Sequence, residues 1–318
     1  MDIGPVPPDT ARADAVVGTD TGLEETWLLG QPSLRDYLDF VRDMAVDAAD
    51  PRALCDEWRR ANDHYHDLEV AEAGIADGVE RRDLDPASAA LAERLTADPH
   101  FRNTFDLLPA SVEMVELDRL VVWQLRVTAT FVRELQAQLG PAPDPEALFR
   151  FCLPARPAYA DVKTRRLGSR RYAFSSESTD LRFHGPELFG AGPLRDHVSF
   201  GPVGGVLGLV VGFGSNLLSA IRADDRLLLQ NGYHRACALR ALGVTHAPCV
   251  VQTVTRRDEL AVVGPQRVVD APAFYFKSAR PPLLKDFFDP RIRKPLRVRR
   301  TRKVIEVSFE VREAHVAE

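Results

Sequence analysis

The chain has 318 residues, of which 45% are hydrophobic and 27% charged, and its formal net charge is −5 at pH 7. This length is enough to bury one large core or two modest ones. The negative charge balance gives no overall attraction to nucleic acid or to an anionic membrane. A surface that binds either partner would therefore have to be local.

Four cysteines, Cys55, Cys152, Cys237 and Cys249, are scattered along the chain and form no CxxC pair. This spacing fits neither a disulfide framework nor a zinc site, so we expect reduced thiols and no metal site. The first residues lack the basic and apolar run of a signal peptide, and the longest apolar stretch, 203–213, is too short to span a bilayer. We therefore expect a cytoplasmic protein with no membrane partner.

The N-terminal third divides into two parts by composition. Residues 1–21 are rich in Pro, Asp and Gly, which predicts a disordered lead. Residues 22–110 show helical periodicity and predict an N-terminal helical region. Asp50 and Asp85 each stand directly before a proline, a pairing typical of an N-cap followed by the first helical turn.

The pattern changes at Val112, where alternation over 112–117 predicts a strand. A helix capped by Thr128 follows, and beyond Asn216 the rhythm is strand, turn, strand, helix, strand. Between these parts lies a long insertion at about 145–220. We expect it to be loop-rich over 154–200, with one strand near 171–174.

The C-terminal part, 266–318, predicts a basic β extension, because residues 297–311 alternate like a strand. Within it, 291–303 holds eight basic residues in thirteen. This run suits contact with phosphates, either of nucleic acid or of a nucleotide. A solvated strand balanced by nearby glutamates explains it equally well.

The segment that carries the most chemical information is LLLQNGYHRACALRALGV, residues 227–244. Its first residues predict a strand, preceded by a hairpin turn at 223–225. Asn231-Gly232 suits a backbone that reverses sharply, since both residues tolerate positive φ. A helix from Tyr233 to Leu242, ended by Gly243, and a strand over 244–252 complete the unit.

This arrangement leaves the first N–H groups of the helix at Tyr233 without intrahelical partners, and the helix dipole adds partial positive charge there. His234 and Arg235 lie in the same first turn. A cation in this position opposes the dipole, so the combination favours a bound anion. The alternative is a plain strand-helix connection in which Arg235 pairs with a nearby acid.

The string NGYHRACALRALGV resembles the phosphate-binding box of the ParB N-terminal/sulfiredoxin-like superfamily. The stretch 112–140, VEMVELDRLVVWQLRVTATFVRELQAQLG, is similar to the opening strand and helix of the same fold. The resemblance implies an α+β protein with a ParB/sulfiredoxin-like core over 111–265, flanked by the helical subdomain and the β extension. It also implies that residues at positions 231–235 grip the phosphates of a nucleotide, ATP or CTP, with Mg²⁺ as an optional companion. The residues assigned to this cofactor site are Asn231, Gly232, Tyr233, His234 and Arg235.

Departures from the family pattern bear on activity. Tyr233 occupies the position of the reactive cysteine of sulfiredoxin, which argues against sulfiredoxin chemistry. Asn231 and Gln124 replace the two carboxylates of the free-serine kinases in this superfamily, so no general base for phosphoryl transfer is evident. The catalytic residues, and whether there is catalysis at all, are left open.

Further candidates lie outside the box. Gln124, Arg182 and His184 are candidate substrate or anion contacts, the last two within an arginine-rich stretch that serves equally as solvated surface. Glycines over 201–214 favour backbone packing over a dinucleotide loop. The histidines of the DHYHD string at 63–67 point to different faces of a helix, which favours surface residues over a metal site.

Two functions follow from these patterns. The first is a nucleotide switch or small-molecule-modifying enzyme that binds a nucleotide or another anionic ligand at the box. The second is a DNA-associated ParB-like protein that uses the basic tail at 291–303, although no helix-turn-helix is evident after residue 265. Either function is compatible with a homodimer.

Overall fold

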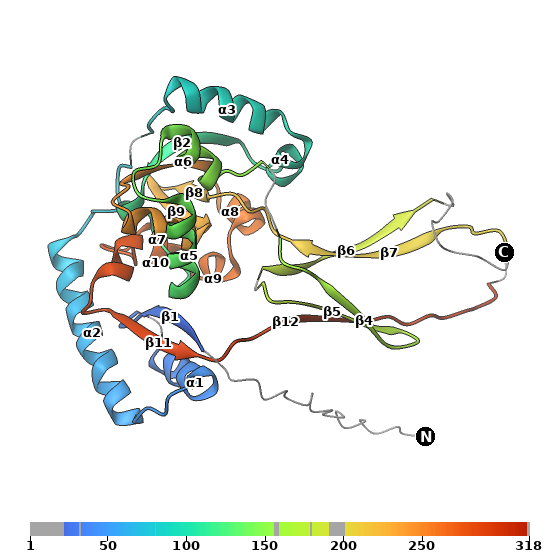
Figure 1. The fold of residues 1–318 in the computed structure, drawn as a ribbon, viewed down its shortest axis with the longest axis horizontal. Helices are drawn as coiled ribbons and strands as arrows, with labels where there is room; N and C mark the ends of the chain where they lie inside the picture. The colour runs from blue at the N-terminus through green and yellow to red at the C-terminus, as the bar shows by residue number, and fades with distance from the viewer. Residues whose placement is uncertain are drawn as a thin grey trace.

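The computed structural model describes residues 22–31, 33–79, 81–155, 159–178, 180–190 and 201–316. The protein is mixed α+β, in agreement with the predicted class. A rounded body holds the helices, and an arm of strands projects from it, on the right in Figure 1. The predicted disordered lead at 1–21 lies outside the described residues.

A four-stranded sheet forms the centre of the body. Its order is β2 (Ala110–Glu116), β10 (His246–Thr253), β8 (Ser219–Ala223) and β9 (Arg226–Asn231). β10 is antiparallel to β2 and parallel to β8. The predicted hairpin is confirmed between β8 and β9, where Asp224 and Asp225 take positive φ angles of 46° and 63°. Such turns match the twist of the strands that they join.

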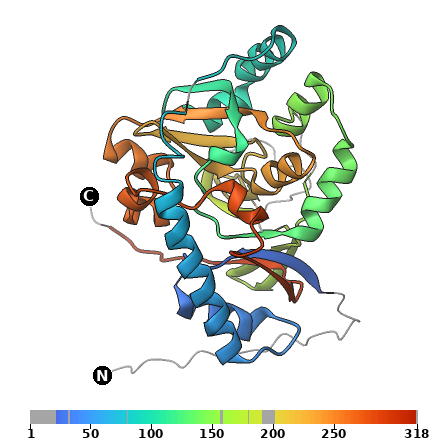
Figure 2. The ribbon, with the colours of Figure 1, turned by 90° about the vertical axis from the view of Figure 1, so that its left-hand side faces the viewer.

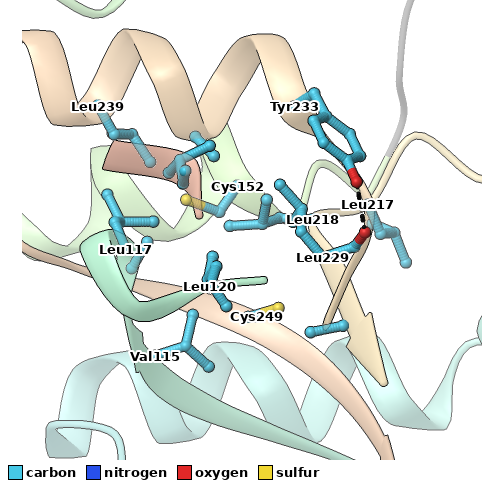
Figure 3. Packing of buried hydrophobic residues seen from close by; sticks show 14 of the residues in the cluster. Val115, Leu117, Leu120, Cys152, Leu217, Leu218, Leu229, Tyr233, Leu239 and Cys249 are labelled. Atoms are coloured by element: carbon cyan, nitrogen blue, oxygen red, sulfur yellow. Dashed lines mark hydrogen bonds between the residues drawn. The ribbon is translucent and has the colours of Figure 1, made fainter. Parts of the chain in front are cut away.

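Helices cover this sheet and close the main core. They are α3 (Pro86–Ala97), α4 (Pro99–Thr104), α5 (Ala129–Leu139), α6 (Pro145–Cys152) and α7 (Tyr233–Ala241). Leu239 of α7 and Cys152 of α6 pack with Leu117, Leu218 and other aliphatic residues in one cluster (Figure 3). The unit predicted over 227–252 is therefore a strand, helix and strand whose helix lies in the centre of the body.

The N-terminal part is less purely helical than predicted. It contains α1 (Leu34–Met44) and α2 (Pro51–Ala71), but it opens with β1 (Leu23–Leu28). β1 pairs with β11 (Arg293–Val298) and β3 (Arg126–Thr128), both distant in sequence, so local periodicity could not reveal it. The predicted N-caps are confirmed: Asp50 and Asp85 accept bonds from the N–H groups of their helices' first turns.

The helical region belongs to the body. α2 runs along its outside (Figure 2). The hydroxyl of Tyr65, in α2, donates to the carbonyl of Arg280 at 2.9 Å. Leu95 and Phe101, from α3 and α4, lie in the same core cluster as α7.

The predicted β extension at 266–318 is wrong in its first part. This part holds α9 (Gln266–Asp270), α10 (Pro272–Phe276) and the 3₁₀ helix η2 (Leu284–Phe288), which follow α8 (Arg257–Val263). Strands begin only at β11, and a break at 299–302 separates it from β12 (Lys303–Ser308). Prolines stand at the starts of α9 and α10. Proline is tolerated in the first turn of a helix, but it lacks the N–H that would bond to a neighbouring strand, so these positions favour short helices.

The arm corrects the prediction of a loop-rich insertion. One sheet has the order β12, β5 (Arg171–Ser176) and β4 (Lys163–Gly168). A ribbon next to it pairs β6 (Leu181–Phe189) with β7 (Val206–Phe213). Of these strands, the sequence predicted the one near 171–174 and, in the alternation over 297–311, β12; it did not predict β4, β6 or β7. β5 pairs with β12, more than a hundred residues later, and this distant partner leaves no local signal.

Candidate functional site

The box residues surround the N-terminus of α7, at the point where the chain leaves β9. Gly232 is the N-cap, with φ of 92° in the left-handed region, as the sequence predicted for a sharp reversal. A Cβ there would lie 2.6 Å from Cδ1 of Leu218 and 3.1 Å from its Cα. The glycine is therefore required both by its backbone angle and by the close approach of the 214–218 segment.

Asn231 holds that segment in place. Its amide Nδ2 donates to the carbonyl of Ser215 at 2.5 Å, and its Oδ1 accepts from the N–H of Gly232 at 2.9 Å. Both polar ends of the side chain are engaged within the protein. Through these two bonds Asn231 stabilises the turn between β9 and α7, a role that asparagine often has in turns.

Tyr233 points into the core rather than toward a ligand. Its hydroxyl donates to the carbonyl of Leu229 at 2.9 Å, a bond drawn in Figure 3. The same oxygen accepts from the N–H groups of Trp123 and Gln124 at 3.0 and 3.3 Å. Burial raises the pKa of this phenol well above its usual range. Tyr233 therefore joins the 120s loop to the sheet.

His234 also faces inward. Its Nε2 accepts from the N–H of Thr128 at 3.0 Å, a role that requires the neutral imidazole. Burial, assisted by repulsion from Arg235, lowers the pKa of His234 to about 4. At neutral pH this side chain is an uncharged acceptor from the backbone, and it cannot supply a second positive charge to an anion.

Arg235 is the box residue whose charge stays uncompensated. Its two terminal nitrogens donate to the backbone carbonyl and to Oδ1 of Asn216, each at 2.7 Å. Within the described part of the chain, no carboxylate lies within 4 Å of its guanidinium. Burial lowers the pKa of Arg235, which reflects the cost of enclosing an unpaired cation.

The sequence drew no attention to Asn216, because an asparagine after a glycine-rich run looks like an ordinary loop residue. In the structure, Asn216 orients the guanidinium of Arg235 by accepting two hydrogen bonds from it. Tyr159 was missed as well. Its ring stacks on Phe213 with ring centroids 4.9 Å apart, and its hydroxyl interacts electrostatically with both Arg235 and Asp180.

The three further candidates lie at different distances from the box. Gln124 is adjacent, since its N–H donates to Tyr233, while its side-chain amide donates to the carbonyl of Arg126. Arg182 pairs with Asp180 and lies against Gly214, two residues before Asn216. His184 is exposed on the arm beside Gly212. Gln124 therefore contacts the box directly, whereas Arg182 contacts only the segment that leads to Asn216, and His184 contacts neither.

α7 supplies the remaining polar groups. It has no side-chain cap, so its first N–H groups lack the partner that a capping Ser, Thr or Asp would give. With Arg235 in the same turn, this end of the helix presents donors and positive charge together. Such a combination can bind a phosphate or another oxyanion.

The described residues contain no group of three or more His, Cys, Asp or Glu side chains placed to hold a metal ion. In the DHYHD string, His64 contacts Asp289 at 3.0 Å and His66 contacts Glu69 at 2.8 Å. No helix in the described ranges is both long and apolar enough to cross a bilayer.

Comparison of the chain with protein-family models, with curated protein sequences and with solved structures gave no match.

Proposed function

We propose that the N-terminus of α7, together with Arg235, binds the phosphate groups of a nucleotide such as ATP or CTP, within a core of the ParB/sulfiredoxin-like kind. One observation carries this proposal. Arg235 is an enclosed cation, has no carboxylate partner among the described residues and lies where a helix dipole disfavours it. A bound phosphate would compensate the charge and accept bonds from the helix N–H groups.

The contacts divide the box into two roles. Asn231, Tyr233 and His234 are engaged by the protein itself and act as the scaffold that fixes the turn. Arg235 and the backbone N–H groups are the part that meets the ligand. Recognition thus rests on fewer residues than the five that the resemblance implied.

The proposal is for binding and does not extend to a reaction. Asn231 and Gln124 hold amides where related kinases hold carboxylates, and Asp180 is engaged by Arg182 and by the N–H of Gly214. None of these groups is placed as a general base. Any Mg²⁺ would be held mainly by the nucleotide's own phosphates. A nucleotide-controlled switch fits these contacts better than a phosphoryl-transfer enzyme.

The experiment is calorimetric titration of the protein with ATP, CTP and inorganic phosphate, for the natural chain and for Arg235→Gln. Loss of a hydrogen bond to a charged group costs about 1.5–3 kcal/mol, so we expect roughly 10- to 150-fold weaker binding. Arg240→Gln is the matched control, because it removes a charge from the other end of the same helix, where Arg240 pairs with Asp118.

Two results would overturn the proposal. One is the absence of heat and of any rise in melting temperature with all three ligands, because a ligand that binds the folded state must stabilise it. The other is an equal loss of affinity in Arg235→Gln and Arg240→Gln, which would mean that general charge and not the helix N-terminus binds the anion.

A further inference from the structure

Two basic stretches that are far apart in sequence meet in the arm. The first is the arginine-rich stretch of β4, β5 and their connecting turn, and the second is the run that enters β12. β12 pairs with β5 from Lys303 opposite Ser176 to Ser308 opposite Arg171, and β5 pairs with β4 on its other side. The arm sheet therefore collects both stretches. The basic residues of the sheet, of the β4–β5 turn and of the segment that enters β12 are Lys163, Arg165, Arg166, Arg170, Arg171, Arg299, Arg300, Arg302 and Lys303.

Most of this charge is open to solvent and unpaired. Arg171 pairs with Glu306 at 2.7 Å, and Arg302 with Glu177 at 3.6 Å. Six other cations have no carboxylate within 4 Å among the residues described: Lys163, Arg165, Arg166, Arg170, Arg299 and Arg300. The chain as a whole is acidic, with a net charge of −5, whereas the arm sheet is a locally positive region.

The cations form a track along the arm. β4 is exposed at all six positions, so its basic residues reach solvent on both faces. Arg299 lies at the root, where its N–H donates to the carbonyl of Met44 in the body, and Arg170 lies in the turn at the far end. At about 3.3 Å per residue, β4 alone spans roughly 20 Å. Figure 1 shows the strands standing clear of the body.

We infer that this arm sheet, β4–β5–β12, binds the phosphodiester backbone of duplex nucleic acid without reading its bases. An extended row of unpaired cations matches a polymer that carries one negative charge per about 1.7 Å of its axis. The major groove admits a two-stranded β-ribbon, and the β4–β5 hairpin at one side of the arm sheet is such a ribbon. This binding surface is separate from the proposed nucleotide site, because Arg235 lies in α7 of the body and not in the arm.

Basic residues on an edge strand can have another role, since they prevent strands of other molecules from adding to the sheet. An anionic membrane surface is another polyanion, and the neighbouring β6–β7 ribbon exposes Leu188 and Leu207, 80% and 64% accessible. The row of exposed cations along a projecting sheet favours nucleic acid. Binding to a duplex, binding to anionic vesicles and aggregation separate the three roles.

The test measures binding of a fluorescent 24-base-pair duplex of arbitrary sequence by anisotropy, from 50 to 200 mM KCl. The variant is Arg165→Gln/Arg166→Gln/Arg170→Gln. The matched control is Arg52→Gln/Arg94→Gln/Arg257→Gln, which removes three exposed charges from body helices. The slope of log K against log salt is negative, and each lost phosphate contact makes it shallower by about 0.9. We therefore expect the slope of the arm variant to be shallower by roughly 2–3 and its affinity to be at least tenfold weaker. The control should match the natural chain, and Arg235→Gln should still bind the duplex.

Four outcomes would overturn the inference. The natural chain could fail to bind the duplex at 50 mM KCl, or the body control could lose as much affinity as the arm variant. The arm variant could keep its affinity but aggregate, which would assign the arginines to edge protection. Finally, the chain could bind phosphatidylserine vesicles through the same arginines and leave the duplex free, which would make the partner a lipid surface.

Discussion

The guanidinium of Arg235 is held at two points by Asn216, through the backbone carbonyl and through Oδ1, each at 2.7 Å. This contact joins the first turn of α7 to the segment that enters β8. Because both contacts come from one residue, the segment and the cation are positioned together, and the geometry of the proposed phosphate site depends on a residue outside the box.

Replacing Asn216 by Ala removes the Oδ1 bond and keeps the carbonyl bond. We expect the affinity for nucleotide to fall by about 1 kcal/mol, roughly fivefold, because Arg235 is less well oriented. Asn62→Ala is the control, since it deletes a different asparagine side-chain bond, in which Nδ2 of Asn62 in α2 donates to the carbonyl of Gly30 at 2.7 Å. Equal affinities in calorimetric titrations of the two variants would show that Asn216 does not position the cation.

Comparing Gly232 with Gly243 separates the cost of a positive φ angle from the cost of a steric clash with an added Cβ. Gly232 and Gly243 have φ of 92° and 81°, but only Gly232 has atoms within 4 Å of an added Cβ, those of Leu218. Gly232→Ala should therefore lower the free energy of unfolding by about 1–3 kcal/mol more than Gly243→Ala does. Urea denaturation of both variants gives the difference, and similar losses would mean that Leu218 moves aside without cost.

The buried imidazole of His234 makes stability depend on pH. Its pKa is about 4 in the folded protein and about 6.5 in the unfolded chain, so the unfolded state binds more protons between these values. The stabilisation is complete above pH 6.5 and is lost as the pH falls toward 4, by up to about 3 kcal/mol.

His234→Gln should flatten this dependence, because glutamine keeps an acceptor for the N–H of Thr128 but does not titrate. The measurement is the free energy of unfolding of both proteins at several values between pH 4 and 7. A parallel decline in the two proteins would assign the acid sensitivity to other groups.

Arg280 and Asp286 form a buried ion pair in which the nitrogens of Arg280 lie 2.6 and 2.5 Å from the carboxylate oxygens. Arg280→Met leaves that carboxylate uncompensated and should cost about 3–5 kcal/mol in urea denaturation. Adding Asp286→Leu should restore a large part of the loss, because Glu72, the other partner of Arg280, keeps its pair with Lys285 at 2.7 Å and no fully buried charge then remains.

The exposed pair Arg256 and Asp258 is the control for this experiment, and Arg256→Met should change stability too little to measure. A double variant at 280 and 286 that is no more stable than Arg280→Met alone would contradict the explanation.

Thiol accessibility provides a check on the core. Cys152, Cys237 and Cys249 are buried, and burial raises the pKa of Cys152 and of Cys237 to about 12. Cys55 is partly exposed. We expect Ellman's reagent at pH 8 to label one thiol per chain in the native protein and four in urea. Rapid native labelling of three or four would show that the core opens.

The sequence by itself determined the units whose signals are local. Asn231-Gly232 and Gly243 mark the turn and the end of α7, and Asp50 and Asp85 mark helix starts, because turn and cap preferences depend on a few adjacent residues. These signals also placed Arg235 in the first turn of the helix. They could not tell which side chains of the box face the core.

Only the tertiary structure decided the rest. Tyr233 and His234 turn inward because the N–H groups that donate to them belong to the 120s loop and to Thr128, about a hundred residues earlier. The arm sheet exists because β12 pairs with β5, and β1 exists because it pairs with β11. A strand is completed by hydrogen bonds to a partner that is distant in sequence, whereas a helix satisfies its own backbone. For this reason the box helix could be predicted from the sequence, and the contacts that hold Arg235 and unite the basic stretches could not.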